Sequence, residues 1–269
     1  MSIPIHVINL RKDEERLSHV SQQLERLGLA FERVEAVHGL NLLEWLRPYF
    51  LDDNGAPGSG LLPGEIGCYA SHLLVCAMVA ERGQAAVVLE DDVGLAPDFG
   101  DLLETLSSLP AGWDIIRLSN PHKRRCVTVR RLSGTYNLVK FTRVSPSTGA
   151  YLISPGGARK FLSWKLLRSL PVDQDLRRTW DCGLRTYGVS PRPVEPDVGT
   201  STIDAMHQRS RKKLRKMFGI RDYMLRTVHE ISWLGFRHWL ASRIYVGSRD
   251  DNPRRHHEVD GEIAKSRFA

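Results

Sequence analysis

Three consecutive acids, Glu90, Asp91 and Asp92, follow the apolar run 85–89. Like charges side by side repel one another, and burying any of them without a partner is costly. If residues 86–89 form a strand, alternation points Glu90 and Asp92 to one face and Asp91 to the other. Two such carboxylates can bind one divalent cation, or one can bind the cation and the other a sugar hydroxyl. The plainer alternative is that the acids cap the next segment or lie in solvent.

Small and hydrogen-bonding residues precede these acids in the segment GEIGCYASH, residues 64–72. We expect this segment to be helical and to bring Ser71 and His72 near the same edge as the acids. For His72 the alternative is a core histidine that bonds to a backbone carbonyl. The four cysteines show no CxxC spacing, so we expect reduced and mostly buried thiols and no zinc ribbon or disulfide framework.

The elements that must position these residues alternate between strand and helix. Apolar runs predict strands at 3–9, 30–37, 85–89 and 113–119, and the intervening periodicity predicts helices at 13–29, 64–83 and 95–110. This order indicates an α/β fold with a mostly parallel sheet flanked by helices. Ligands bind beyond the carboxyl ends of strands in such sheets, where we expect Asn9, the three acids and Ser119.

The other segments of the chain up to residue 206 show weaker patterns. Residues 48–63 are rich in Gly, Pro, Asp and Asn, which predicts a long loop of the kind that often serves as a lid. Residues 136–167 predict a strand pair followed by a helix, and residues 171–194 carry an acidic cluster before a last strand. We therefore expect a catalytic domain over 1–206.

The chain has a net charge of +7, and this charge is unevenly distributed. Residues 207–269 hold 15 Lys and Arg against 7 Asp and Glu, a balance of +8, so residues 1–206 carry −1. We expect a basic amphipathic helical extension over 207–246 and a disordered tail over 247–269. Its apolar stripe comprises Leu214, Met217, Phe218, Leu225, Val228, Ile231, Trp233, Leu234, Trp239 and Leu240.

Two interpretations of this extension stay open: docking of residues 208–246 on an anionic membrane, or packing of the stripe on the catalytic domain. No run approaches about 18 apolar residues, and the N-terminus turns charged too soon for a signal peptide. We therefore expect a cytoplasmic protein. Basicity confined to the tail does not favour a nucleic-acid partner.

A set of motifs, in this order and at these distances, resembles the family 25 glycosyltransferases, bacterial lipooligosaccharide enzymes that include β-1,4-galactosyltransferases. The resemblance covers about residues 3–205 and rests on IHVINLRKDEERLSHVSQQLERLGLAFERVEAVHG, GEIGCYASH, VVLEDDV, WDIIRLS, TGAYLIS and PVDQDL. It implies a GT-A fold, a UDP-sugar donor, UDP-galactose in the best known members, a divalent cation, Mn²⁺ or Mg²⁺, and inversion at the anomeric carbon. The acceptor would be a saccharide or lipid-linked glycan, which would place the protein at the inner face of the bacterial inner membrane.

The resemblance also implies roles for individual residues. Glu90 and Asp92 would bind the metal and diphosphate, and Asp91 would bond the ribose or sugar. Asn9, Leu10 and Arg16 would hold the nucleotide, although Arg16 can equally lie on a solvated helix face. Gly149 would let the backbone approach the sugar closely.

Asp173 is the candidate base, because the resemblance places it at a matching PVD position and an inverting transfer needs a carboxylate to take the acceptor's proton. It can instead be a second metal ligand, or the N-cap of a following helix.

The chain departs from the family pattern at Arg11, at His38–Gly39 and at Gln174, which leaves the donor sugar and the acceptor open. Rival functions are a non-catalytic binding protein that grips a membrane or nucleic acid with its basic tail, a nucleotidyltransferase, and a metal-dependent phosphatase. The residues 8–16, INLRKDEER, offer no aspartate pair of the haloacid phosphatase type.

Overall fold

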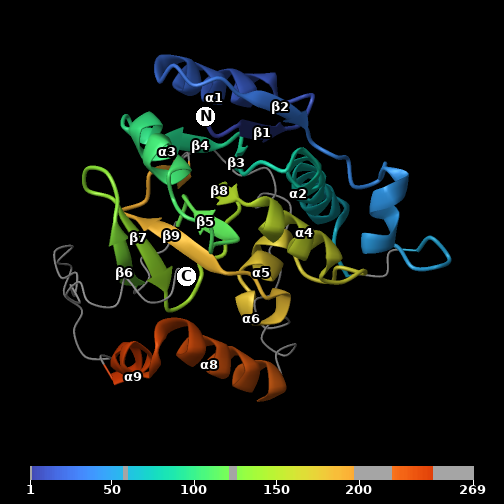
Figure 1. Ribbon diagram of the computed structural model, residues 1–269. Helices are drawn as coiled ribbons and strands as arrows, with labels where there is room; N and C mark the ends of the chain where they lie inside the picture. Colours follow the sequence, from blue (N-terminus) through green and yellow to red (C-terminus); the bar gives the residue numbers. More distant parts are fainter. Residues whose placement is uncertain (1, 57–59, 121–125, 197–219, 245–269) are drawn as a thin grey trace.

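A computed structural model describes residues 2–56, 60–120, 126–196 and 220–244 (Figure 1). Its centre is an eight-stranded sheet in the order β2-β1-β3-β8-β5-β9-β7-β6. The strands are β1 Ile5–Asn9, β2 Glu32–Glu35, β3 Ala86–Glu90, β5 Ile115–Arg117, β6 Cys126–Arg131, β7 Asn137–Phe141, β8 Ala150–Ile153 and β9 Thr186–Ser190. A second sheet pairs β4 Val93–Leu95 with β10 Val194–Pro196.

Strand directions confirm the α/β class with a mostly parallel sheet. β1 runs parallel to both β2 and β3, and β5 runs parallel to β9. β8 lies between β3 and β5 and is antiparallel to both, so β3 and β5 point the same way. β7 is antiparallel to β9 and to β6. Six of the eight strands therefore share one direction, and β1, β3 and β5 end at the same edge of the sheet.

Helices cover both faces of the sheet. They are α1 Glu14–Arg26, α2 Pro63–Arg82, α3 Phe99–Ser107, α4 Pro155–Ser163, α5 Val172–Leu176, α6 Thr179–Cys182, α8 Ile220–Leu234 and α9 Phe236–Ile244, with a 3₁₀ helix η1 Glu44–Tyr49. Buried side chains of α2, α4 and α5 form one core cluster, and those of α1 and α3 form the other. Along β3, Ala86 and Val88 join the α2 cluster while Val87 and Leu89 join the α1 cluster. Alternation therefore carries Glu90 to the α2 face and Asp91 to the α1 face.

Each strand and helix predicted before residue 120 is present. β4, β6, β10 and η1 were not predicted, and the expected strand pair is not a pair, because β8 lies between β3 and β5 while β7 lies beside β9 and β6. The segment 48–63 is anchored at its start, since Phe50 within it and Leu46 just before it are fully buried. Residues 57–59 of that segment lie outside the described residues.

The helix α8 packs along the lower end of the sheet (Figure 1). Asp222 accepts hydrogen bonds from Arg178 (2.9 Å) and Trp180 (3.0 Å). The Trp233 ring lies edge-on to Tyr187, with ring centroids 5.0 Å apart, and below the Lys140 ammonium at 4.2 Å. One face of the extension thus packs on the domain formed by residues 2–196.

The opposite face of α8 and the start of α9 are exposed. The exposed large apolar side chains are Tyr223, Met224, Leu225, Val228, Phe236 and Leu240. Of the predicted stripe, Leu214, Met217 and Phe218 lie outside the described residues, as does the tail 247–269.

By length and composition alone, α2 could cross a membrane, which corrects the expectation that no run is long and apolar enough. This is weak support for a span, because 56% of its most apolar window is buried inside the protein, as in the core helix of a soluble domain. The four cysteines are free thiols, and Cys76 and Cys182 are buried.

Candidate active site

A cavity of about 320 Å³ opens at the edge where β1, β3 and β5 end. Its lining brings together five of the predicted site residues, from four separate segments of the chain. The lining residues are Glu90, Asp92, Val93, Ser119, Pro146, Ser147, Thr148, Gly149, Asp173 and Pro196. The predicted edge is therefore the place where the structure gathers acids around a cavity.

Glu90 ends β3 and faces α2. Its Oε1 lies 3.2 Å from His72 Nε2, and its backbone N–H donates to the Gly149 carbonyl at 2.9 Å. Burial alone would raise the pKa of the Glu90 carboxyl, but hydrogen bonds from His72 and Thr148, with the charges of His72 and Arg16, hold it below its usual value. Glu90 is thus an anion poised at the cavity wall.

Asp91 turns the other way, toward α1, as alternation predicts. Its Oδ2 accepts a 2.7 Å hydrogen bond from Asn9 Nδ2, and its Oδ1 lies 3.2 Å from Arg16 Nη2. Burial raises the pKa of Asp91, while the contacts with Asn9 and Arg16 oppose the shift. Asn9 is itself buried and also donates to the Asp13 carbonyl at 2.9 Å. The contacts of Asn9 and Arg16 therefore hold Asp91 in place.

Asp92 lines the cavity and pairs with the same arginine, Arg16 Nη2 lying 2.6 Å from its Oδ2. Burial, and next the negative charge of Glu90, raise the pKa of Asp92 to about 6. Arg16 therefore offsets only part of the repulsion. Carboxylate oxygens are the ligands that Mn²⁺ and Mg²⁺ prefer, so Glu90 and Asp92 fit such a cation in both donor type and charge.

Burial and the nearby charge of Glu90 disfavour the ionised form of Asp92, so we predict that Asp92→Asn stabilises the metal-free protein. Because the folded pKa of about 6 lies above the usual 3.8, the stability that Asp92 contributes is present below about pH 4 and is lost as pH rises through 6. Urea unfolding in EDTA should find the variant more stable by about 1–2 kcal/mol at pH 8, allowing for partial exposure. The difference should vanish toward pH 4, and the exposed Asp101→Asn should show none. A variant less stable than wild type at pH 8 would contradict this.

Asp173 lies on the cavity wall in the first turn of α5. The N-cap of α5 is Pro171, so the alternative that Asp173 caps the helix is wrong. Burial raises the pKa of Asp173, although the Gln174 side chain donates to its Oδ2 at 2.7 Å. Asp175, two residues on, points into the core and accepts from Tyr69 at 3.0 Å. Asp173, and not Asp175, is the acid presented to the cavity.

Ser119 and Gly149 are neighbours in the cavity wall. Ser119 is 1% exposed, and its hydroxyl has no hydrogen-bond partner among the described residues. A Cβ built on Gly149 would lie 3.4 Å from Val93 Cγ1 and 3.7 Å from Ser119 Oγ, which is ordinary contact. The protein itself therefore does not require glycine at this position, while a closely bound ligand would.

The structure does not bring every predicted residue to the cavity. Ser71 is fully buried, and its hydroxyl accepts from the Val37 N–H and donates to the Gly67 carbonyl. Leu10 follows β1 in the turn to α1, outside the cavity lining. His72 is buried as the core alternative expects, but its ring bonds Tyr151 and Glu90 and not a backbone carbonyl.

Sequence reasoning missed Arg117, the last residue of β5. Its guanidinium is fully buried and donates to the Ser145 carbonyl at 2.9 Å, which anchors the loop that lines the cavity. Burial lowers the pKa of Arg117 to about 10, while the carboxylates of Asp173 and Glu90 oppose this shift, so the group stays cationic at neutral pH. A lone arginine inside the apolar run DIIRLS was the available signal.

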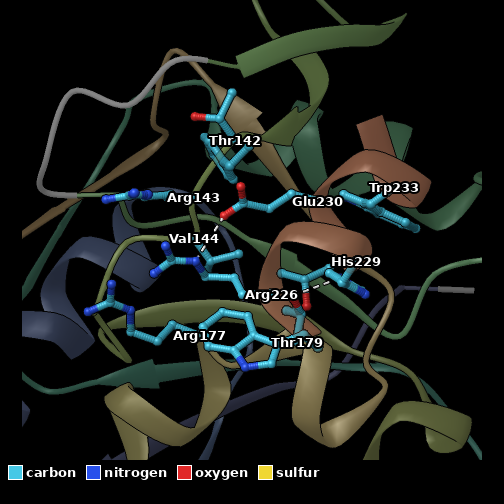
Figure 2. Close-up of a pocket in the computed structure, with 12 residues that line it drawn as sticks. Thr142, Arg143, Val144, Arg177, Thr179, Arg226, His229, Glu230 and Trp233 are labelled. Atoms are coloured by element: carbon cyan, nitrogen blue, oxygen red, sulfur yellow. Dashed lines mark hydrogen bonds and ion pairs between the residues drawn. The ribbon is translucent and has the colours of Figure 1, made fainter. Parts of the chain in front are cut away.

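A second cavity lies where α8 meets the end of β7 (Figure 2). Arg226 pairs with Glu230 at 3.4 Å, and His229 bonds Thr179 at 3.1 Å across this seam. The cavity measures about 30 Å³, about a tenth of the 320 Å³ of the cavity at the sheet edge. It is a packing seam of α8 and not a place for a sugar nucleotide.

Comparison with known proteins agrees with this geometry. The profile of glycosyltransferase family 25 (LPS biosynthesis protein) matches residues 2–176. Procollagen galactosyltransferase 1-A of Xenopus laevis is 31% identical over 189 residues, covering 66% of this chain and 31% of that protein. Inactive glycosyltransferase 25 family member 3 of Mus musculus is 34% identical over 193 residues, covering 66% and 32%. The chain thus spans about a third of the length of these relatives.

Solved structures include a mutant Drosophila β-1,4-galactosyltransferase 7 in complex with manganese, UDP-Gal and xylobiose. It aligns with a TM-score of 0.42 at 10% identity and covers 80% of this chain and 79% of that one. A glycosyltransferase involved in glycosylation of the major capsid of PBCV-1 aligns at 0.40 and 12%, covering 81% and 100%. The profile match extends over about two thirds of the chain and includes β1, the three acids and Asp173. The chain belongs to glycosyltransferase family 25.

Proposed function

We propose that this chain transfers galactose from UDP-galactose to a hydroxyl of a saccharide acceptor, in a metal-dependent reaction that inverts the anomeric carbon. One observation carries the proposal: a single cavity is lined by the adjacent acids Glu90 and Asp92 and by the distant acid Asp173. A glycosyl transfer needs both a charge-neutralising site for the diphosphate and a separate carboxylate for the acceptor. The name of the Xenopus relative supports galactose as the sugar.

Each acid has its own part in the proposed reaction. Glu90 and Asp92 would hold Mn²⁺ or Mg²⁺, which when bound supplies the positive charge that a departing diphosphate requires. Asp173 takes the proton of the attacking hydroxyl, and burial that raises its pKa brings it nearer to the pH at which a base works well. Arg16, which pairs with both Asp91 and Asp92, would add a second positive charge for the diphosphate.

If the donor approaches Gly149 closely, Gly149→Ala should weaken donor binding without changing the stability of the protein. The added methyl group meets no atom closer than 3.4 Å, so the melting temperature should stay unchanged. Inside the cavity the methyl would crowd the sugar, and we expect KM for the UDP-sugar to rise about tenfold, the effect of roughly 1–2 kcal/mol of lost contact. Gly60→Ala, in open space on the surface, is the matched control. An unchanged KM in Gly149→Ala would remove Gly149 from the donor site.

The acceptor we propose is a sugar of lipopolysaccharide or a related surface glycan. The description of the matching family profile supports this class, whereas the Xenopus relative is named for procollagen. Both acceptor classes offer a hydroxyl group to a base, so the role of Asp173 does not depend on the choice.

The direct test is release of UDP from UDP-galactose, UDP-glucose and UDP-N-acetyl sugars, with Mn²⁺ or Mg²⁺ and with metal removed. We expect metal-dependent turnover that is fastest with UDP-galactose. A relative with the name inactive glycosyltransferase supports the rival hypothesis, in which this chain is a binding protein with the same fold and no transferase activity. Nucleotide binding without turnover of any donor, in the presence of a saccharide acceptor, would favour that rival.

We further propose that the exposed face of α8 and α9 contacts an anionic membrane, which would place the protein at the inner face of the bacterial inner membrane. Support comes from the exposed apolar side chains, among them Met224, Val228 and Phe236, on a segment whose surrounding residues 207–269 carry +8. Apolar burial and attraction of cations to anionic lipid act together at such surfaces.

Flotation with vesicles that contain anionic lipid tests this contact. Met224→Glu/Val228→Glu should reduce the bound fraction about tenfold, because both side chains are exposed and play no part in the packing of α8. Leu40→Glu, at an exposed leucine in the turn after β2, should bind as wild type does. Equal flotation of the double variant and wild type would mean that this face does not meet the membrane.

A further inference from the structure

A second group of metal-ligating atoms lies beside the predicted cation site. Cys68 Sγ, a ring nitrogen of His72 and a Glu90 carboxylate oxygen all lie within 4.8 Å of one another. Cys68 and His72 are four residues apart on α2, so they occupy the same helix face, and Glu90 meets them from the end of β3. The geometry comes from two packed core elements and not from a loop.

The donor types differ from those of the proposed diphosphate site. A thiolate, an imidazole and a carboxylate are the ligands of zinc, and three of them with one open position form a common zinc arrangement. Two ligand atoms on one tetrahedral zinc ion lie about 3.3–3.8 Å apart, given zinc bonds of about 2.0–2.3 Å. His72 Nε2 and Glu90 Oε1, at 3.2 Å, already have nearly this separation. Hard cations such as Mg²⁺ prefer oxygen ligands, so the thiol favours zinc over Mg²⁺.

The histidine is held in the orientation that a metal ligand needs. His72 is 1% exposed, and its Nδ1 lies 2.9 Å from the hydroxyl of the fully buried Tyr151. In metal sites the second ring nitrogen of a ligating histidine almost always donates to a carboxylate, a backbone carbonyl or water, which fixes the ring and directs the other nitrogen to the ion. The Tyr151 hydroxyl can accept from Nδ1 in the same way, and Nε2 faces Glu90.

Cys68 has no role in the proposed transfer. Burial first, then the charges of Glu90, Asp173 and Asp92, raise the pKa of its thiol well above the usual value. The metal-free thiol is therefore protonated and is not a nucleophile. A bound divalent cation reverses this balance, because coordination deprotonates a thiol.

We propose that Cys68, His72 and Glu90 form a binding site for a zinc-class divalent cation, distinct from the Glu90–Asp92 site but sharing Glu90. Since one carboxylate serves both sites, zinc at this position weakens binding of Mn²⁺ with the nucleotide. That second consequence rests on the proposed function, whereas zinc binding itself does not.

The test uses the full-length, metal-stripped protein titrated with Zn²⁺ against a chromogenic chelator, and with Co²⁺ as a spectroscopic substitute. We expect a near-ultraviolet thiolate-to-cobalt band in wild type that is absent in Cys68→Ser, and zinc affinity at least tenfold weaker in Cys68→Ser and in His72→Gln. Cys126→Ser, a half-buried thiol on the far edge strand β6, is the matched control.

Histidines elsewhere in the chain can bind zinc but cannot give the thiolate band. The proposal is overturned if wild type shows no such band, or if Cys68→Ser and Cys126→Ser bind zinc equally well. If UDP and Mn²⁺ fail to stabilise the protein while the cobalt band is present, the proposed function fails and the zinc site stands. If UDP and Mn²⁺ stabilise the protein but the cobalt band is absent, the zinc site is rejected and the proposed function is unaffected.

Discussion

Asp173→Asn should lower the rate of sugar transfer by about two to four orders of magnitude, the usual contribution of a positioned general base. The amide keeps the size and much of the hydrogen bonding of the carboxyl, including a partner for Gln174, but cannot take a proton. We expect the fold to survive, because Asp173 is not the N-cap of α5 and borders the cavity. Initial rates with saturating UDP-galactose and acceptor measure the effect.

The same variant separates the two roles that stay open for Asp173. If it is the base, kcat falls while stabilisation of the variant by UDP with Mn²⁺ stays at the wild-type level. If it is a second metal ligand, that stabilisation falls as well. Asp181→Asn, a partly exposed acid on the neighbouring α6, should keep wild-type rates. An Asp173→Asn enzyme with more than about a third of wild-type activity would rule out the base assignment.

Glu90→Gln and Asp92→Asn should each weaken metal-dependent nucleotide binding by about 100-fold or more. Residues that merely orient metal ligands cost about 10–100-fold in metal affinity when changed, and a ligand itself should cost at least as much. Asp92→Asn should be inactive yet more stable without metal, because it removes a carboxyl whose pKa is raised to about 6. Titration of Mn²⁺ at fixed UDP, followed by calorimetry, measures the loss.

Glu104→Gln, an exposed glutamate on α3, is the control for charge alone. Loss of binding in Glu90→Gln and Asp92→Asn but not in this control assigns the cation to the cavity. Wild-type affinity in both cavity variants would mean that the acids are a structural cluster neutralised by Arg16 and His72, without a metal role.

The sequence was most informative where a simple period governs the geometry. Strand alternation predicted that Glu90 and Asp91 face opposite sides, and the two core clusters on the faces of β3 confirm it. The shared direction of β1, β3 and β5 brought Asn9 and the acids to one edge, as expected for an α/β sheet. Residues on a strand can be assigned to faces without knowledge of any distant partner.

The predictions that failed concern the direction in which a side chain leaves its helix, and contacts between residues far apart in the sequence. Ser71 and His72 were both assigned to the site, but neighbouring helix residues point about 100° apart, so only His72 reaches Glu90. Nothing local indicates that Arg16 bridges Asp91 and Asp92, or that Asp222 of α8 bonds Arg178. An apolar stripe likewise does not indicate which surface it packs against. On α8, Trp233 packs against Tyr187 while Met224 stays exposed.

The melting temperature with UDP and Mn²⁺, together and apart, tests the central claim most directly. At about 100 times the dissociation constant a ligand adds about 2.7 kcal/mol, which for a domain of this size is about 5–10 °C. We predict that shift only when nucleotide and Mn²⁺ are both present, and its absence in Glu90→Gln. No shift with any UDP-sugar and metal, or an equal shift in Glu90→Gln, would contradict a metal-dependent sugar-nucleotide site in this cavity.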